Sequence, residues 1–236
     1  MDLYETVRIG NFQQVKYFIE NSTDNHEINV KVLLHLATVN GHLDIVKYLI
    51  ERYQDIDIYA NNDIALHLAA QNNHFDIIKY FVEKKVNANT LNGSILAYAV
   101  QYNCMHMIIY LIEKGANIHA LNEIALKAAV TFNHFDIVKY LIEHGADIHI
   151  ENDYVLRLAV RKGLIDIVKY LIKCGADIRA DNNRALRWGL KYQIKYNNKF
   201  NIVKYLISCY NKEELKELFF KFDDLYIKYL ILEQSI

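Results

Sequence analysis

A heptapeptide that returns at a constant distance is the feature that most limits how this chain can fold. DIVKYLI begins at Asp44, Asp136 and Asp166, and near-copies begin at Asp76 and Asn201. The copies that start at positions 76, 106, 136 and 166 lie 30 residues apart. A repeated period of about 20–50 residues is typical of arrays in which each unit packs mainly on its neighbours. We therefore expect the chain to form a repeat array.

Each repeat contains two stretches with the spacing of a helix. The first begins at a leucine, as in LHLAA from Leu66, and has apolar residues at i, i+3 and i+4. The second is the heptapeptide, whose wider apolar stripe suits a helix that packs on both sides. Its first residue, Asp or Asn, favours the positive end of the helix dipole. Glycine follows at Gly115, Gly145 and Gly175, where a left-handed residue ends a helix. These patterns predict an all-α chain.

The two stretches resemble the two helices of the ankyrin repeat. The match rests on HFDIVKYLIEHGADI from His134 for the second helix and on LHLAA from Leu66 for the first. It covers nearly the whole chain and implies a solenoid of stacked helix-turn-helix units. The unit has 30 residues where the family has about 33. Short repeats without the family's Thr-Pro resemble ankyrin arrays encoded by giant DNA viruses of amoebae, which implies a virus-encoded protein in the host cytoplasm.

The segment between repeats is short and contains a recurring asparagine. Asparagine tolerates the left-handed conformation and can bond to its own backbone, so it predicts a tight turn. We expect a short extended linker, such as residues 146–153, with the family's β-hairpin truncated to a turn. The recurring asparagines are Asn62, Asn92, Asn122, Asn152 and Asn182.

The ends of the array are expected to differ from its middle, because terminal repeats need a polar outer face. Between Leu186 and Asn201 the spacing is 15 residues instead of ten, so residues 191–198 hold an insertion that we expect to lengthen the first helix. We expect a single array of eight units over residues 1–236, with an N-terminal cap in 1–30, six inner repeats in 31–207 and a degenerate C-terminal cap in 208–236.

Nothing in the sequence indicates catalysis or a cofactor. His42, His74 and His134 share one repeat position, which indicates structural hydrogen bonds more than metal binding. The tyrosine that recurs in every repeat is expected to pack on the neighbouring second helix with its hydroxyl in water. Motifs for nucleophilic, phosphate-binding or zinc chemistry are absent. We expect a non-enzyme without metal or cofactor.

Cysteine usage and hydropathy indicate the compartment. The three cysteines are odd in number and widely spaced, which is typical of reduced thiols in a cytoplasmic protein. No apolar run approaches the roughly 18–20 residues that a membrane helix needs. We expect a cytoplasmic monomer without a membrane segment.

Candidate binding residues are those that vary between repeats. In the ankyrin family the turn tips and the last turn of the first helix line the concave face. Here those positions, with the residue after each leucine, become aromatic and basic toward the C-terminus, and aromatic and Arg side chains are favoured at binding hot spots. A solvated helix face with incidental aromatic residues is the plain alternative. The candidates are Gln101, Tyr102, Thr131, Phe132, Arg157, Arg161, Lys162, Arg187, Lys191 and Tyr192.

Two functions follow from these residues. The first is a protein-interaction scaffold or adaptor, for which an acidic host protein is a candidate partner. The alternative is binding of nucleic acid or another polyanion through residues 157–204. This segment has twelve Lys and Arg against three Asp and Glu, a net charge of +9, and includes Trp188, Tyr192 and Tyr196. Basic charge with aromatic rings can bind single strands.

Overall fold

The computed structural model describes residues 2–22, 29–53, 64–84, 93–193, 200–221, 228 and 231. These residues form fifteen helices and no strand, which confirms the all-α prediction. The first helices of the repeats are α1 (Leu3–Ile9), α3 (Val30–Val39), α5 (Ile64–Gln71), α7 (Ser94–Gln101), α9 (Ala120–Thr131), α11 (Ile150–Lys162) and α13 (Ala180–Gln193). The second helices are α2 (Phe12–Glu20), α4 (Leu43–Arg52), α6 (Phe75–Glu83), α8 (Met105–Glu113), α10 (Phe135–Glu143), α12 (Ile165–Lys173) and α14 (Phe200–Ser208).

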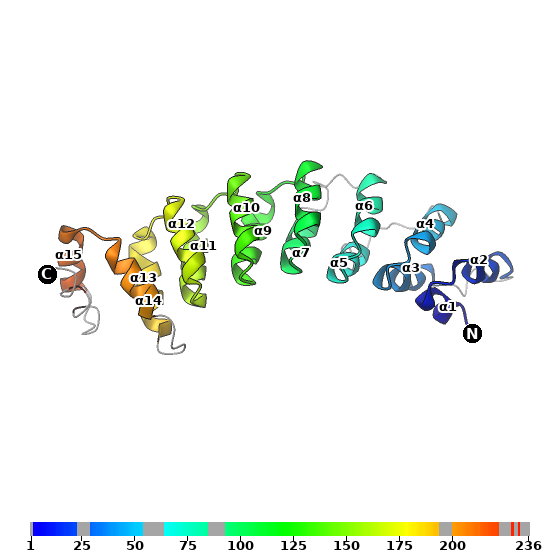
Figure 1. Ribbon diagram of the computed structural model, residues 1–236, viewed down its shortest axis with the longest axis horizontal. Coiled ribbons are helices and arrows are strands. Elements are labelled where there is room, and N and C mark those ends of the chain that lie inside the picture. The colour runs from blue at the N-terminus through cyan, green and yellow to red at the C-terminus, as the bar shows by residue number, and fades with distance from the viewer. Residues whose placement is uncertain are drawn as a thin grey trace. The chain divides into compact units, whose positions relative to one another are not determined.

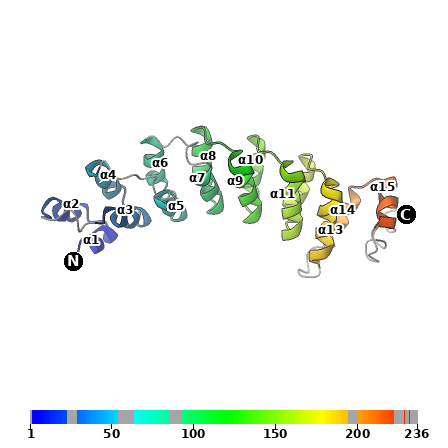
Figure 2. The same ribbon diagram turned by 180° about the vertical axis from the view of Figure 1, so that it is seen from behind.

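The helices fall into two compact units, Met1–Ala125 and Leu126–Ile236. Within the units α1, α3, α5, α7, α11 and α13 each pack on the second helix of their own repeat, and α1, α3, α5 and α11 also pack on the first helix of the next. The first helices thus make one layer and the second helices another (Figures 1 and 2). A further helix, α15 (Lys212–Lys221), follows α14 and buries Leu215 and Leu218. The prediction of eight units remains a prediction, because residues 222–227, 229, 230 and 232–236 of the last one lie outside the described residues.

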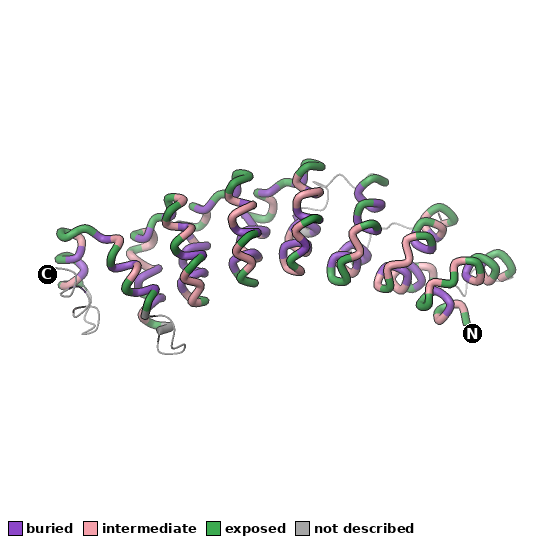
Figure 3. Tube along the Cα trace, in the orientation of Figure 1, coloured by how far each residue is buried: buried purple, intermediate pink, exposed green. Residues whose placement is uncertain are grey.

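The repeated apolar positions form the core of each unit, seen as the purple inner sides of the helices in Figure 3. In the second helices the buried residues are those of the heptapeptide, such as Ile167, Val168 and Leu171 of α12. In the first helices Ala37 and Ala159 are fully buried. Their small side chains let neighbouring first helices approach closely.

The segment between repeats differs from the extended linker that we expected. Asn122, Asn152 and Asn182 have φ near 57°, which confirms the left-handed turn at these three positions. Asn62 and Asn92 lie outside the described residues. The residues on either side of each asparagine are also left-handed, so residues 121–123, 151–153 and 181–183 each form one turn of opposite hand before the right-handed helix begins. Three consecutive left-handed residues are costly for L-amino acids, at about 1–2 kcal/mol each. Tertiary contacts must therefore stabilise this turn.

Two recurring side chains connect successive repeats of the first unit. The Nε2 atom of His42 hydrogen-bonds the carbonyl of Arg8 at 3.0 Å, and that of His74 bonds the carbonyl of Val39 at 2.9 Å. These bonds confirm the structural role of the histidine position. The tyrosine rings pack edge-on against phenylalanines, as Tyr110 does on Phe75. Contrary to our expectation, the Tyr110 hydroxyl is buried although the residue as a whole is half-buried, and this burial raises the pKa of Tyr110.

Candidate interaction surface

A buried carboxylate stabilises the left-handed turn at the start of α11. Asp153 is 5% exposed, and its Oδ1 accepts hydrogen bonds from His149 Nδ1 at 3.0 Å and from the Asp177 backbone N–H at 2.9 Å. The second bond comes from the following repeat. Glu123 accepts from His119 in the same way. The turn is therefore held by its own histidine and by the next repeat, and it sets where the first helix starts.

Arg157 differs from the exposed side chain that we expected. It is 6% exposed, and its guanidinium donates to the Glu151 carbonyl and, from Nη1, to Asp181 Oδ2 at 3.2 Å. Glu151 and Asp181 belong to the left-handed turns of successive repeats. The expectation failed because Arg157 lies at the height of these turns, which cover it. Arg157 joins two repeats and is not part of an open surface.

Around Arg157 the first helices of the second unit form a row of alternating cations and aromatic rings. Lys127 Nζ and Arg157 Cζ lie 5.6 and 5.5 Å from the Tyr154 ring centre. Arg157 Cζ and Arg161 Cζ lie 5.8 and 5.3 Å from the Trp188 ring centre. A cation within about 6 Å of an aromatic ring is attracted to its face. We call Lys127, Tyr154, Arg157, Arg161 and Trp188 the cation–aromatic row.

The other candidates on α11 and α13 lie around this row. Lys162 and Lys191 are exposed. Arg187, also exposed, donates to the Asp181 carbonyl at 3.3 Å, so it shares a turn with Arg157. The backbone of Tyr192 belongs to α13, but its side chain lies outside the described residues, as do residues 194–199 with most of the insertion. The structure thus brings together Arg157, Arg161 and Arg187.

The remaining candidates lie at the ends of other first helices. Thr131 is the last residue of α9, and Phe132 follows it. Phe132 is 45% exposed, and its ring stacks on the His134 ring with 6.1 Å between the two ring centres. Gln101 and Tyr102 belong to the first unit, where the Tyr102 hydroxyl lies 3.4 Å from His67 Nε2. These two residues are described within that unit alone.

Three members of the row were missing from our candidates. Lys127 and Trp188 vary between repeats, but only their contacts show that they belong together. Tyr154 stands where Ile64 and Ile124 stand in other repeats, and this change from aliphatic to aromatic was a usable signal. Tyr154 lies near the start of its helix, whereas the candidates lie at the last turn or directly after the leucine.

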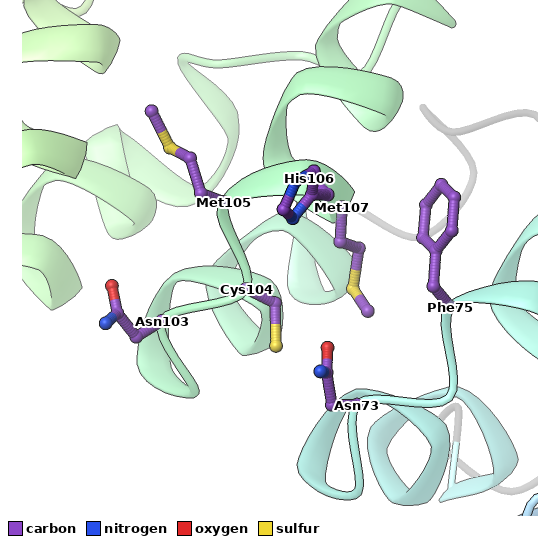
Figure 4. A pocket seen from close by; sticks show the side chains of 7 residues that line it. All are labelled: Asn73, Phe75, Asn103, Cys104, Met105, His106 and Met107. Atoms are coloured by element: carbon purple, nitrogen blue, oxygen red, sulfur yellow. The ribbon is translucent and has the colours of Figure 1, made fainter.

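A cavity of about 370 Å³ lies in the first unit, between the turn after α5 and the start of α8. Cys104 stands there at the position that His42 and His74 occupy in other repeats. Its thiol donates to the Ala70 carbonyl at 3.7 Å, and burial raises the pKa of the thiol. Figure 4 shows the sulfur atoms of Cys104 and Met107 facing the Asn73 side chain, while Met105 points away. Within the described ranges no group of three or more His, Cys, Asp and Glu side chains could hold a metal ion.

Replacing Arg157 with alanine is expected to lower the free energy of unfolding by about 1–2 kcal/mol, because hydrogen bonds to two turns are lost. The effect stays moderate because Asp181 keeps Arg184, whose Nη1 lies 2.8 Å from Oδ2. Urea unfolding measures it, and Lys162→Ala on the exposed side of α11 is the control. Equal midpoints for the two variants would contradict the buried role of Arg157.

The layered helix pairs are those of an ankyrin-type solenoid, with left-handed turns between the repeats. The family model for ankyrin repeats matches residues 3–92, 66–152 and 126–217, and the chain belongs to this family. In fold it is similar to the human ASB11 ankyrin repeat domain, with a TM-score of 0.61 and 19% sequence identity over 78% of this chain and 96% of that one. No curated protein matches it in sequence. None of the helices in the described ranges is long and apolar enough to cross a membrane.

Proposed function

We propose that this chain is a non-catalytic adaptor that binds a partner protein through the first-helix layer of its second unit. Ankyrin-repeat domains generally serve as protein-interaction scaffolds, and the family is typically non-catalytic. The observation that carries the proposal is the cation–aromatic row, because Arg and aromatic side chains dominate binding hot spots. Arg161 and Trp188 of this row are half-buried, so a partner can contact them.

The proposed surface also includes Phe132, Lys162, Arg187, Lys191 and Tyr192. Phe132 adds an exposed ring at the end of α9. Gln101 and Tyr102 are a second candidate area, on the first unit. Arg157 is buried within the row and lies close to both of its aromatic rings. We further propose a monomer that acts in the cytoplasm, of an infected host if the chain is viral; the free thiols Cys104, Cys174 and Cys209 are consistent with a reducing compartment.

Capture of the partner protein by purified variants of this chain tests this proposal. Phe132→Ala and Arg161→Ala are each expected to reduce capture at least tenfold without lowering the melting temperature. Phe220→Ala and Lys173→Ala are matched controls, because Phe220 is 85% exposed on α15 and Lys173 is exposed on a second helix. Equal capture by the test and control variants, or loss of fold in the test variants, would refute the proposed surface.

A further inference from the structure

The first-helix layer of the second unit is strongly basic. From Leu126 onward, α9, α11 and α13 contain seven Lys and Arg against three Asp and Glu, a net charge of +4. The second helices α10, α12 and α14 contain four against three, a net charge of +1. In the first unit, α5 and α7 have no Lys, Arg, Asp or Glu. Among these helices the basic charge is therefore concentrated in the first-helix layer of the second unit.

The three acidic residues of this layer are already engaged by other groups. Asp153 is buried against His149 and a backbone N–H. Glu151 Oε1 lies 2.8 Å from Lys127 Nζ, and Asp181 Oδ2 receives both Arg157 and Arg184. The layer keeps its net positive charge after these pairs are formed. Complementary charge on a partner would thus be negative.

The aromatic rings of the row distinguish between two kinds of negative partner. Single-stranded nucleic acid binds by stacking its bases on open ring faces. Here the Tyr154 ring already has Lys127 and Arg157 close to it, and the Trp188 ring has Arg157 and Arg161. Guanidinium and ammonium groups pair well with carboxylates, and the exposed or half-buried cations of this layer include Arg161, Lys162 and Arg187. The geometry favours a carboxylate-bearing ligand over stacked bases.

We propose that the partner binds this layer with an acidic, extended peptide segment. The inference rests on the proposed function and specifies the chemistry of the partner. Neighbouring helices pack about 8–10 Å apart, so the axes of α9 and α13 are separated by about 20 Å. An extended chain advances about 3.3 Å per residue. A segment of about six or seven residues that is rich in Asp and Glu therefore spans the three first helices.

Fluorescence anisotropy with the full chain tests this inference, using a labelled peptide of eight glutamates at low ionic strength. We expect the peptide to bind, an eight-glutamine peptide not to bind, and an oligothymidylate to compete poorly. The double variant Arg161→Gln/Lys162→Gln should weaken binding of the acidic peptide at least tenfold. The matched variant Lys169→Gln/Lys173→Gln removes the same charge from α12 and should weaken it less than twofold.

Three outcomes would overturn the inference. They are no binding of the glutamate peptide, equal loss in both double variants, and oligothymidylate binding that is tighter and also depends on Arg161. The proposed function is tested separately by partner capture. If Phe132→Ala and Arg161→Ala abolish capture while the glutamate peptide fails to bind, the interaction surface stands and only its preference for acidic segments is wrong.

Discussion

Replacing Gly41 with alanine is expected to lower the free energy of unfolding by about 2–3 kcal/mol. Gly41 has φ of +79°, and a Cβ atom there would lie 2.6 Å from Cε1 of His74. Left-handed backbone costs a residue with a Cβ about 1–2 kcal/mol. The His74 ring must also move, which breaks its bond to the Val39 carbonyl, worth about 0.5–1.5 kcal/mol. Urea unfolding gives the change in free energy.

Gly115 supplies a matched control for this prediction. Its φ is +85°, and a Cβ atom there would have no heavy atom within 4 Å. Gly115→Ala should therefore show the backbone cost alone, about 1–2 kcal/mol. The cost of His74→Ala should also be smaller in the Gly41→Ala background, because the bond is already lost. Equal effects of the two glycine substitutions would show that the His74 ring does not hold the repeats together.

Asp153→Ala is expected to lower the free energy of unfolding by about 2–3 kcal/mol. The substitution removes the acceptor of two hydrogen bonds, one of them the part-buried bond from the Asp177 N–H of the following repeat. It also removes a contact that holds three left-handed residues in place. Urea unfolding of the full chain measures the loss, and hydrogen exchange of α11 and α13 shows whether it is local.

Two further substitutions serve as controls for the Asp153→Ala prediction. Asp153→Asn should cost less than Asp153→Ala, since an amide oxygen can still accept. Asn183 occupies the same position in the next repeat, where it accepts from the Tyr210 hydroxyl at 2.8 Å. Asp166→Ala, at an exposed position in the first turn of α12, should stay within about 0.5–1 kcal/mol. If Asp153→Ala were no worse than Asp166→Ala, the turn would need another explanation.

The candidate surface was predictable in part. The repeat frame selected Arg161, Lys162 and Phe132, and the structure places all three at exposed or half-buried positions. It also selected Arg157, which is buried. Helical periodicity shows which face a residue occupies, but it does not show how deeply the neighbouring turns cover that face.

The cavity at Cys104 shows the same limit for the packing between repeats. The sequence shows that a cysteine replaces the recurring histidine. Whether the neighbouring side chains close the space depends on atoms of the preceding repeat, about 30 residues earlier, and here Asn73 and Met107 leave it open. The sequence shows that the side-chain volume changes at this position. It does not show whether neighbouring side chains fill the space that is left.

The sequence by itself determined the period, the two helices of each repeat and the left-handed asparagine between repeats. These features depend on local spacing and backbone preference, which a residue carries with it. The tertiary structure alone decided that the turn has three left-handed residues, because its stability comes from Asp153 and the backbone of the following repeat. It also assembled Lys127, Tyr154 and Trp188 into one row, since contacts between residues about 30 apart exist only after the helices stack.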